Sequence, residues 1–292
     1  MARKVEIRIV RSDLKEFKID GSDWEIPSEG GLEGFGSYEN DITMIDNAVG
    51  DGGIYGSDRI AQKDRTIMAK SRNPVMNEIL RKAAISFFNS KFMFKVYVTY
   101  MGETRWCEGK IHRFELPTGN IYQTMTMTVT FLFANPFLKS YDNFGENIAS
   151  ISPMCAFPYL CSVTEGTPKG ITSGTFNFAQ KIVLENDGDT ETYCKAVFTA
   201  KGAVTNPKLI INGNYVRVLD TMVEGDVIII DFTQNPPTVQ KNGVNYIGHC
   251  DRTSAFDEMA LVVGDSEVSF DADDGGNLMD VSIYYNNLYG AI

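Results

Sequence analysis

A strict alternation of apolar and polar residues, just before the middle of the chain, is the clearest pattern in the sequence. The two alternating sets are Thr124, Thr126, Thr128 and Thr130 on one face, and Met125, Met127, Val129, Phe131 and Phe133 on the other. A period of two predicts a half-buried strand of an antiparallel sheet. The pattern stops at Asn135-Pro136-Phe137, where Pro136 has no main-chain donor for a ladder. We therefore expect the strand, and the first domain with it, to end near residue 140.

Shorter alternating segments in the first half predict further antiparallel strands. They are "VEIRIV" (5–10), "RIAQKDRTIM" (59–68), "KFMFKVYVTY" (91–100) with Phe92, Phe94, Val96, Val98 and Tyr100 on one face, and "TRWCEGKIHRFEL" (104–116). A turn is expected at Pro117-Thr118-Gly119-Asn120.

One segment, "RNPVMNEILRKAAISFFNS" (72–90), predicts a helix. Asn73 can cap it, and Pro74 suits the first helical position. Apolar residues at spacings of three and four predict a stripe that packs on the core. The predicted stripe consists of Met76, Ile79, Leu80, Ala83 and Phe87.

Residues 21–56 show no steady period and contain nine glycines. This composition predicts a long loop with little structure of its own. Loops of this length in compact domains are usually functional or held in place by another element. We expect the segment to lie at an interface, where packing on a neighbour can order it.

The second half of the chain alternates short strand-like segments with turn residues. Residues 141–174, rich in Ser, Pro, Gly and Thr, are predicted to be a linker. The strand candidates that follow are "TFNFAQKIVLE" (175–185), "YCKAVFTA" (193–200), "PKLIING" (207–213), "YVRVL" (215–219), "DVIIIDF" (226–232), "PTVQKNG" (237–243) and "VSIYYNNLY" (281–289). Seven or more short strands with frequent turns, and no helical pattern, predict a β-sandwich over residues 175–292. The fold class is thus mainly β, with an antiparallel sheet and one helix in residues 1–140.

The balance of charge also differs between the two halves of the chain. Residues 1–150 hold 19 Lys and Arg against 20 Asp and Glu, whereas residues 151–292 hold 8 against 18, within a total net charge of −11. An acidic chain without a basic run is a poor candidate for binding a phosphate backbone. No apolar run approaches the roughly 20 residues of a membrane span. The first residues have no apolar centre typical of a secretion signal, so we expect the protein to stay in a cytosol or to leave by another route.

The five cysteines, Cys107, Cys155, Cys161, Cys194 and Cys250, are widely spread and odd in number. This spacing predicts free thiols instead of a disulfide framework. Cys155 and Cys161 form a close pair, but no CxxC motif or nearby histidine supports a zinc site.

The residues that could carry catalysis do not form a recognisable site. His112 lies in a predicted strand. His249 adjoins Cys250, and the side chains of these two adjacent residues would point to opposite faces of an extended segment. No GxSxG elbow, HExxH helix or Walker loop occurs, and "GGLEGFG" (30–36) lacks the Lys-Ser/Thr and helix of a phosphate loop. We therefore predict no catalytic, cofactor-binding or metal site, and no cofactor.

"DADDGGNLMD" (271–280) partly matches a calcium-binding loop. Asp271, Asp273 and Gly276 stand at suitable positions, but Gly275 and Ser282 replace two oxygen ligands. The alternative, a hairpin turn that uses Asp and Gly for backbone freedom, is the preferred interpretation.

Several blocks together resemble the distal tail proteins of long-tailed bacteriophages, the siphovirus tail-component family. They are "YGSDRIAQKDRTI" (55–67), "VTFLFANPFLKS" (129–140), "NDGDTETYCKAVFTAKGAVTNPKLIINGN" (186–214), "EGDVIIIDFTQNPPTVQKNGVNYIG" (224–248) and "VSIYYNNLYGAI" (281–292). The strand that ends in Asn-Pro-Phe is similar to an Asp-Pro-aromatic element common in that family.

The resemblance implies an N-terminal belt domain that forms a hexameric ring and a C-terminal galectin-like or carbohydrate-module-like sandwich outside it. The implied partners are further copies of this chain, the tail tube protein, and a tail-tip protein, either a tail-associated lysin or a receptor-binding protein. DNA would pass through the ring without being recognised, no membrane is involved, and the location would be the virion tail tip after assembly in the host cytoplasm. Two other functions remain open: a module binding cell-surface sugar, and a hydrolase of wall polymers. Both tryptophans, Trp24 and Trp106, lie in the first domain, which leaves the second without the usual platform for sugar stacking.

Overall fold

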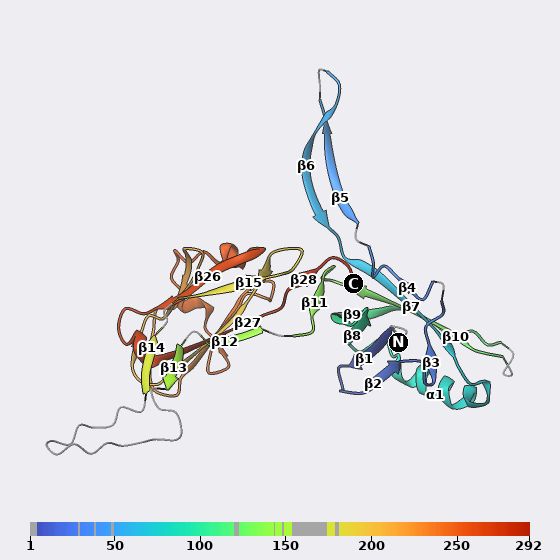
Figure 1. Ribbon diagram of the computed structural model, residues 1–292. Helices are drawn as coiled ribbons and strands as arrows, with labels where there is room; N and C mark the ends of the chain where they lie inside the picture. Colours follow the sequence, from blue (N-terminus) through green and yellow to red (C-terminus); the bar gives the residue numbers. More distant parts are fainter. Residues whose placement is uncertain are drawn as a thin grey trace, which may run out of the picture. The chain divides into compact units, whose positions relative to one another are not determined.

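The computed structural model describes residues 5–28, 30–37, 39–47, 50–119, 123–142, 144–147, 149–153, 174–178 and 181–292 (Figure 1). The chain divides into two compact units. Unit 1 comprises Met1–Tyr141 with Leu288–Ile292, and unit 2 comprises Asp142–Asn287. Among the described residues the chain is mainly strand with one α-helix, so the predicted fold class is confirmed.

Unit 1 is built on a sheet with strand order β2-β1-β8-β9-β10-β7-β3, to which β4 and β11 add at β7 and β9. Its strands are β1 (Glu6–Arg11), β2 (Glu16–Ile19), β3 (Trp24–Glu25), β4 (Leu32–Glu33), β5 (Asn40–Asp46), β6 (Gly53–Ile60), β7 (Lys63–Ser71), β8 (Phe94–Tyr100), β9 (Glu103–Glu115), β10 (Thr126–Phe133), β11 (Leu138–Ser140) and β28 (Leu288–Tyr289). The alternating strand predicted from the threonine pattern is β10, and its Met127, Val129, Phe131 and Phe133 are all buried as expected.

The long strand β9 joins the two halves of this sheet. Residues up to Gly109 pair with β8, and residues from Lys110 onward pair with β10. A Cβ on Gly109 would lie 2.5 Å from the main-chain oxygen of Leu132 and 2.7 Å from the ring of Phe133. Only glycine therefore permits this close approach of backbone to backbone.

The helical segment begins with η1 (Pro74–Met76) and continues as α1 (Asn77–Phe87). The Asn73 side chain accepts a hydrogen bond of 3.1 Å from the amide of Val75, so the predicted cap is confirmed. The predicted stripe is only partly right, because the buried face consists of Asn77, Leu80, Ala84 and Phe87. Asn77 is buried because its amide donates to the oxygen of Gln123 and its oxygen accepts from Ser71. Met76, Ile79 and Ala83 consequently face outward.

The prediction of an irregular loop over residues 21–56 is wrong. The segment contains β3, β4 and β5, and it continues into β6 as a hairpin. The predicted strand over 59–68 is divided between the end of β6 and most of β7.

Unit 2 consists of two larger sheets that share one core, as expected for the predicted sandwich. The sheet orders are β12-β27-β17-β22-β23-β24 and β15-β26-β19-β20, with small pairs β13-β14, β16-β25 and β18-β21. The strands are β12 (Phe144–Asn147), β13 (Ala149–Pro153), β14 (Gly174–Phe178), β15 (Lys181–Asn186), β16 (Thr192–Tyr193), β17 (Lys195–Ala200), β18 (Val204–Thr205), β19 (Lys208–Ile211), β20 (Asn214–Arg217), β21 (Thr221–Met222), β22 (Val227–Asp231), β23 (Thr238–Lys241), β24 (Val244–Asn245), β25 (Ala260–Leu261), β26 (Gly264–Asp271) and β27 (Met279–Tyr285). Short 3-10 turns are η2 (Ile247–His249), η3 (Phe256–Glu258) and η4 (Gly276–Leu278).

The core of unit 2 draws residues from both larger sheets, such as Phe198 and Ile230 from one and Leu209 and Phe270 from the other. Of the predicted linker, residues 144–147 and 149–153 are strands, whereas residues 154–173 lie outside the described part of the chain. The described helix is too short and too polar to cross a membrane.

The last residues of the chain, Leu288–Ile292, belong to unit 1. No pattern in the sequence predicts this return. β28 pairs with β11, and the amide of Ile292 donates to the oxygen of Phe35 over 3.0 Å. The guanidinium of Arg105 lies 3.8 Å from the centre of the Tyr289 ring.

Candidate assembly surface

The hairpin of β5 and β6, hereafter the arm (residues 40–60), projects from unit 1 as a two-stranded ribbon (Figure 1). Every residue of β5 is exposed. Across the two strands of the arm, five exposed side chains are large and apolar: Ile42, Met44 and Ile45 on β5, and Ile54 and Tyr55 on β6. Ile54 is 63% exposed and Tyr55 is 75% exposed. The arm therefore leaves apolar surface open to solvent within a single chain.

The register of the arm places apolar pairs on both of its faces. Met44 lies opposite Tyr55, and the next pair along the ribbon is Ile45 opposite Ile54. Residues directly opposite each other share a face, and successive residues of a strand point to opposite faces. One pair therefore lies on each face, so a partner that covers a single face would leave the other exposed.

A bulge at Gly56 permits this arrangement. Thr43 pairs with Ser57 and Met44 with Tyr55, so Gly56 is the extra residue. A Cβ at Gly56 would lie 3.2 Å from the Ile45 side chain, which occupies that space. Bulges of this kind bend a strand and re-aim the side chains on either side of it.

The energetics of the arm favour a bound state. An isolated two-stranded hairpin is marginally stable in water. Burial of one large apolar side chain contributes about 1.5–3 kcal/mol. Contiguous exposed apolar residues in a soluble protein mark interaction surfaces. The arm is thus the strongest candidate for a functional surface in the described part of the chain.

The base of the arm is fixed by a buried cation. Arg65 on β7 is fully buried and donates to the oxygens of Gly34, over 3.2 Å, and of Pro136, over 2.6 Å. Its guanidinium also lies against the rings of Phe35 and Phe133. Burial lowers the pKa of Arg65. The segment before the arm and the turn after β10 are therefore fastened to one side chain.

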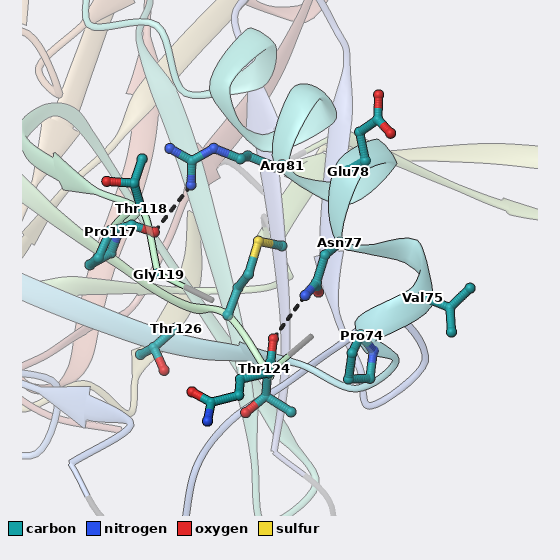
Figure 2. A pocket seen from close by; sticks show the side chains of 12 residues that line it. Pro74, Val75, Asn77, Glu78, Arg81, Pro117, Thr118, Gly119, Thr124 and Thr126 are labelled. Atoms are coloured by element: carbon teal, nitrogen blue, oxygen red, sulfur yellow. Dashed lines mark hydrogen bonds between the residues drawn. The ribbon is translucent and has the colours of Figure 1, made fainter. Parts of the chain in front are cut away.

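A second open surface lies at η1 and α1. A groove of about 1050 Å³ runs between the first turns of the helix and residues 117–119 and 123–126 (Figure 2). Its walls are set by the Asn77 amide on the oxygen of Gln123 and by the Arg81 guanidinium on the oxygens of Leu116 and Pro117. No pattern in the sequence points to this groove, because the two segments that form it are separated by some 35 residues.

The histidines singled out in the sequence are not brought together with a nucleophile. His112 on β9 is exposed and lies 3.3 Å from an oxygen of Asp64. His249 lies in η2 and stacks on Tyr246 with 3.8 Å between ring centres. The pKa of the neighbouring Cys250 thiol is raised by burial to about 11, which leaves little thiolate at neutral pH.

The aspartate-rich segment from Asp271 to Asp280 is not a hairpin turn, because β26 and β27 belong to different sheets. Asp273 accepts a hydrogen bond of 2.7 Å from Asn206 and pairs with Arg217. Gly275 has a φ of +72°, as a turn of this kind requires. Within the described residues no group of three or more possible metal ligands is found. The segment connects the two sheets, and the carboxylate of Asp273 within it pairs with the guanidinium of Arg217.

The described cysteines Cys107, Cys194 and Cys250 are free thiols. Burial raises the pKa of Cys107 and of Cys194 to about 12. Cys155 and Cys161 lie outside the described residues.

Comparison with known families gives a match within unit 2. Residues 187–289 match the family described as siphovirus-type tail component, C-terminal domain. The resemblance drawn from the sequence is confirmed.

Solved structures extend the likeness in fold to the full chain. The SPP1 Dit (gp 19.1) protein, whose structure is described as a paradigm of hub adsorption apparatus in Gram-positive infecting phages, has a TM-score of 0.63, with 10% identity over 97% of this chain and 98% of that chain. A chain of the phage P2 baseplate in its activated conformation with Ca gives a TM-score of 0.50, with 13% identity over 100% of both chains. The corresponding structure with Sr gives a TM-score of 0.51, with 12% identity over 99% of both chains. At these identities the comparisons establish the fold. A search of curated proteins finds no match to this chain.

Proposed function

We propose that this chain is a structural hub protein of a phage tail tip. Residues 1–140 form a belt that closes into a ring of six copies, and the sandwich of residues 175–292 lies outside it. The ring connects the tail tube to the baseplate or receptor-binding machinery, and DNA passes through its channel. The family match of residues 187–289 and the fold likeness to phage hub and baseplate proteins support this proposal.

The observation that carries the ring is the arm with apolar pairs on both faces. A closed ring is built from head-to-tail contacts, so each copy must present two different surfaces. The arm supplies a projecting surface that is unsuited to solvent on either face. Enclosure between copies would remove both apolar pairs from water.

The role we propose is scaffolding without catalysis. Its partners are further copies of the chain, the tail tube protein, and a tail-associated lysin or receptor-binding protein at the tip. The protein is assembled in the host bacterial cytoplasm and is carried in the virion tail tip. The net charge near zero over residues 1–150 suits a channel through which DNA must move without being retained.

Negative-stain electron microscopy of the purified protein tests the proposal. We expect closed rings with six-fold symmetry and a central channel. Ile85→Ser serves as the control for substitutions in the arm. It removes an exposed apolar side chain from α1, leaves the arm intact and should give the same rings. A preparation that stays monomeric at every concentration tested, with the arm protected from proteases, would contradict the proposal.

A further inference from the structure

A row of basic and aromatic side chains crosses the unit 1 sheet on the face that points away from its core. Five neighbouring strands contribute one residue each, in register: Lys18 on β2, Arg8 on β1, Tyr97 on β8, Trp106 on β9 and Lys139 on β11. Residues next to them in sequence are buried in the core, and they include Ile19, Ile9, Val96, Cys107 and Leu138. Successive residues of a strand point to opposite faces, so the five side chains share the outer face. We call these five residues the aromatic row.

The members of the aromatic row contact one another. The guanidinium of Arg8 lies 4.4 Å from the centre of the Tyr97 ring, and the Tyr97 and Trp106 ring centres are 6.0 Å apart. The ammonium groups of Lys139 and Lys95 lie 5.0 Å and 5.1 Å from the centre of the Trp106 ring. Cations attracted to the ring faces in this way keep both the rings and the charges in defined positions.

The two central rings are held in place and remain partly accessible. Trp106 and Tyr97 are half-buried, and the indole nitrogen of Trp106 donates a hydrogen bond of 2.9 Å to the oxygen of Ser140. Tyr141, which is 55% exposed, lies edge-on to Tyr97 with 6.1 Å between ring centres. Cross-strand pairs stabilise a sheet, but an accessible group of tryptophan, tyrosine and arginine is also the composition that contributes most binding energy at protein interfaces.

Charge on this face indicates the kind of partner. Three of the five residues in the aromatic row are basic, and Lys95 adds a fourth cation beside it. Carboxylates border the row on the same face, from Glu16 and Glu108 on one side and from Glu6 on the other. Glu16 lies 3.5 Å from Arg8 in an ion pair open to solvent. A uniformly negative polymer such as duplex DNA would meet these carboxylates, whereas a protein segment can match both signs of charge.

The dimensions of the aromatic row suit a short extended segment. Its strands are about 4.8 Å apart, so the row spans about 19 Å, which is the length of about six extended residues. Lys18 and Arg8 lie at one end of the row and Lys139 at the other, with the two rings between them. A matching segment has carboxylates at both ends and a proline-rich or aliphatic centre that packs on the rings.

We propose that the aromatic row docks an extended acidic segment of another tail protein. The segment lies across the strands, with its carboxylates facing Arg8 and Lys139 and its apolar centre against Tyr97 and Trp106. This inference rests on the proposed function, since it names the chemistry by which the hub holds one of its partners.

A peptide titration tests the recognition. The probe is the peptide Asp-Glu-Pro-Pro-Glu-Asp, and tryptophan fluorescence reports it because Trp106 lies in the row whereas Trp24 is only 2% exposed. We expect a saturable change that weakens at least about tenfold when Arg8→Gln and Lys139→Gln are combined. The control combines Lys70→Gln and Lys110→Gln, which removes two exposed charges of unit 1 outside the row and should bind as the unsubstituted protein does.

Three results of this titration would overturn the inference. They are the absence of a saturable change, an equal loss of binding in both double variants, and an equally strong response to a short DNA duplex or to the charge-reversed peptide Lys-Arg-Pro-Pro-Arg-Lys. Negative-stain images separate these results from the proposed function, because the variant with Arg8→Gln and Lys139→Gln should still form rings. Absence of rings from the unsubstituted protein would overturn the proposed function and this inference together.

A zero-length crosslink tests the contact in assembled tails that contain this protein. Carbodiimide joins a lysine amine to a carboxylate that touches it, with loss of water, and mass spectrometry of the digest identifies both residues. We expect Lys95 or Lys139 to be linked to an Asp or Glu of a different tail protein. Links from these lysines only to copies of this chain, or no links from them, would overturn the inference and leave the proposed function standing.

Discussion

The buried guanidinium of Arg65 donates a hydrogen bond of 2.6 Å to the main-chain oxygen of Pro136. β10 ends at Phe133, and Pro136, which has no main-chain donor, cannot continue its ladder; the oxygen of Pro136 receives this bond. The Asn135 side chain accepts a bond of 2.9 Å from the amide of Phe137 and shapes the same turn. The Asn-Pro-Phe element thus closes the sheet and supplies an anchor for the side chain that holds the base of the arm.

Replacement of Arg65 by methionine should destabilise unit 1 by about 2–4 kcal/mol. The half-buried oxygens of Gly34 and Pro136 lose their charged donor, at a cost of about 1–2 kcal/mol each. Chemical denaturation measures the change in the free energy of unfolding. Arg59→Met is the matched control, because the Arg59 side chain is exposed and should change the free energy by less than about 0.5 kcal/mol. Equal effects of the two substitutions would contradict this account of Arg65.

Gly109→Ala should destabilise unit 1 by at least about 1–3 kcal/mol, the usual cost of overpacking. The new methyl group would meet the oxygen of Leu132 at 2.5 Å, and neither strand can move without disturbing the sheet. Gly36→Ala is the control, since no atom lies within 4 Å of the point that a Cβ on Gly36 would occupy. Thermal unfolding of the two variants compares them, and a Gly109→Ala variant as stable as Gly36→Ala would refute the close approach.

Acid should weaken unit 2 through Asp226. The pKa of Asp226 is lowered to about 2, first by the Asn242 side chain, then by the Val223 amide and by Lys241. A carboxylate with a lowered pKa stabilises the fold above its unfolded pKa of about 3.9, and this contribution is lost as the pH falls toward 2.

The melting temperature of Asp226→Asn should therefore fall less steeply than that of the unsubstituted protein between about pH 4 and pH 2. Asp265→Asn, at an exposed position of β26, serves as the control and should follow the unsubstituted protein. Parallel curves for Asp226→Asn and the unsubstituted protein would show that the Asp226 contacts do not contribute.

Thiol labelling should separate the cysteines by burial. Cys107 and Cys194 are buried, with pKa values raised to about 12, so maleimide at pH 8 should label them only as fast as the protein unfolds. Cys250 is partly accessible, with a pKa of about 11, and should react slowly but measurably in the folded state. Peptide mass spectrometry over time follows each site. Rapid labelling of Cys107 in folded protein would contradict the packing of β8 and β9.

The sequence predicts well the elements whose two faces differ. β10 is predictable residue by residue because one face is buried and the other is half-buried. β26 escapes prediction because its core-facing positions include Ser266, which is fully buried yet polar. The cap locates the helix, but the pattern assigns its inward face only in part, because a buried asparagine, Asn77, takes the place of an apolar residue.

The arm is not predictable as a hairpin, because its sequence shows neither an alternation of apolar and polar residues nor a continuous apolar run. Apolar residues occur on both faces, and Gly56 shifts the register by one residue, so no alternation is visible. Its interface role is expected only from the need of a glycine-rich segment for support. The groove depends on packing between segments that are distant in sequence, and periodicity alone carries no such information.

The mass of the particle in solution tests the central claim most directly. Light scattering after size exclusion should give about six times the 32.5 kDa of one chain for the unsubstituted protein. A variant with Met44→Ser, Ile45→Ser, Ile54→Ser and Tyr55→Ser removes the apolar pairs from both faces of the arm and should elute as a folded monomer with an unchanged circular dichroism spectrum. A hexamer that persists in this variant, or a monomer for the unsubstituted protein, would contradict the claim that the arm joins the copies into a ring.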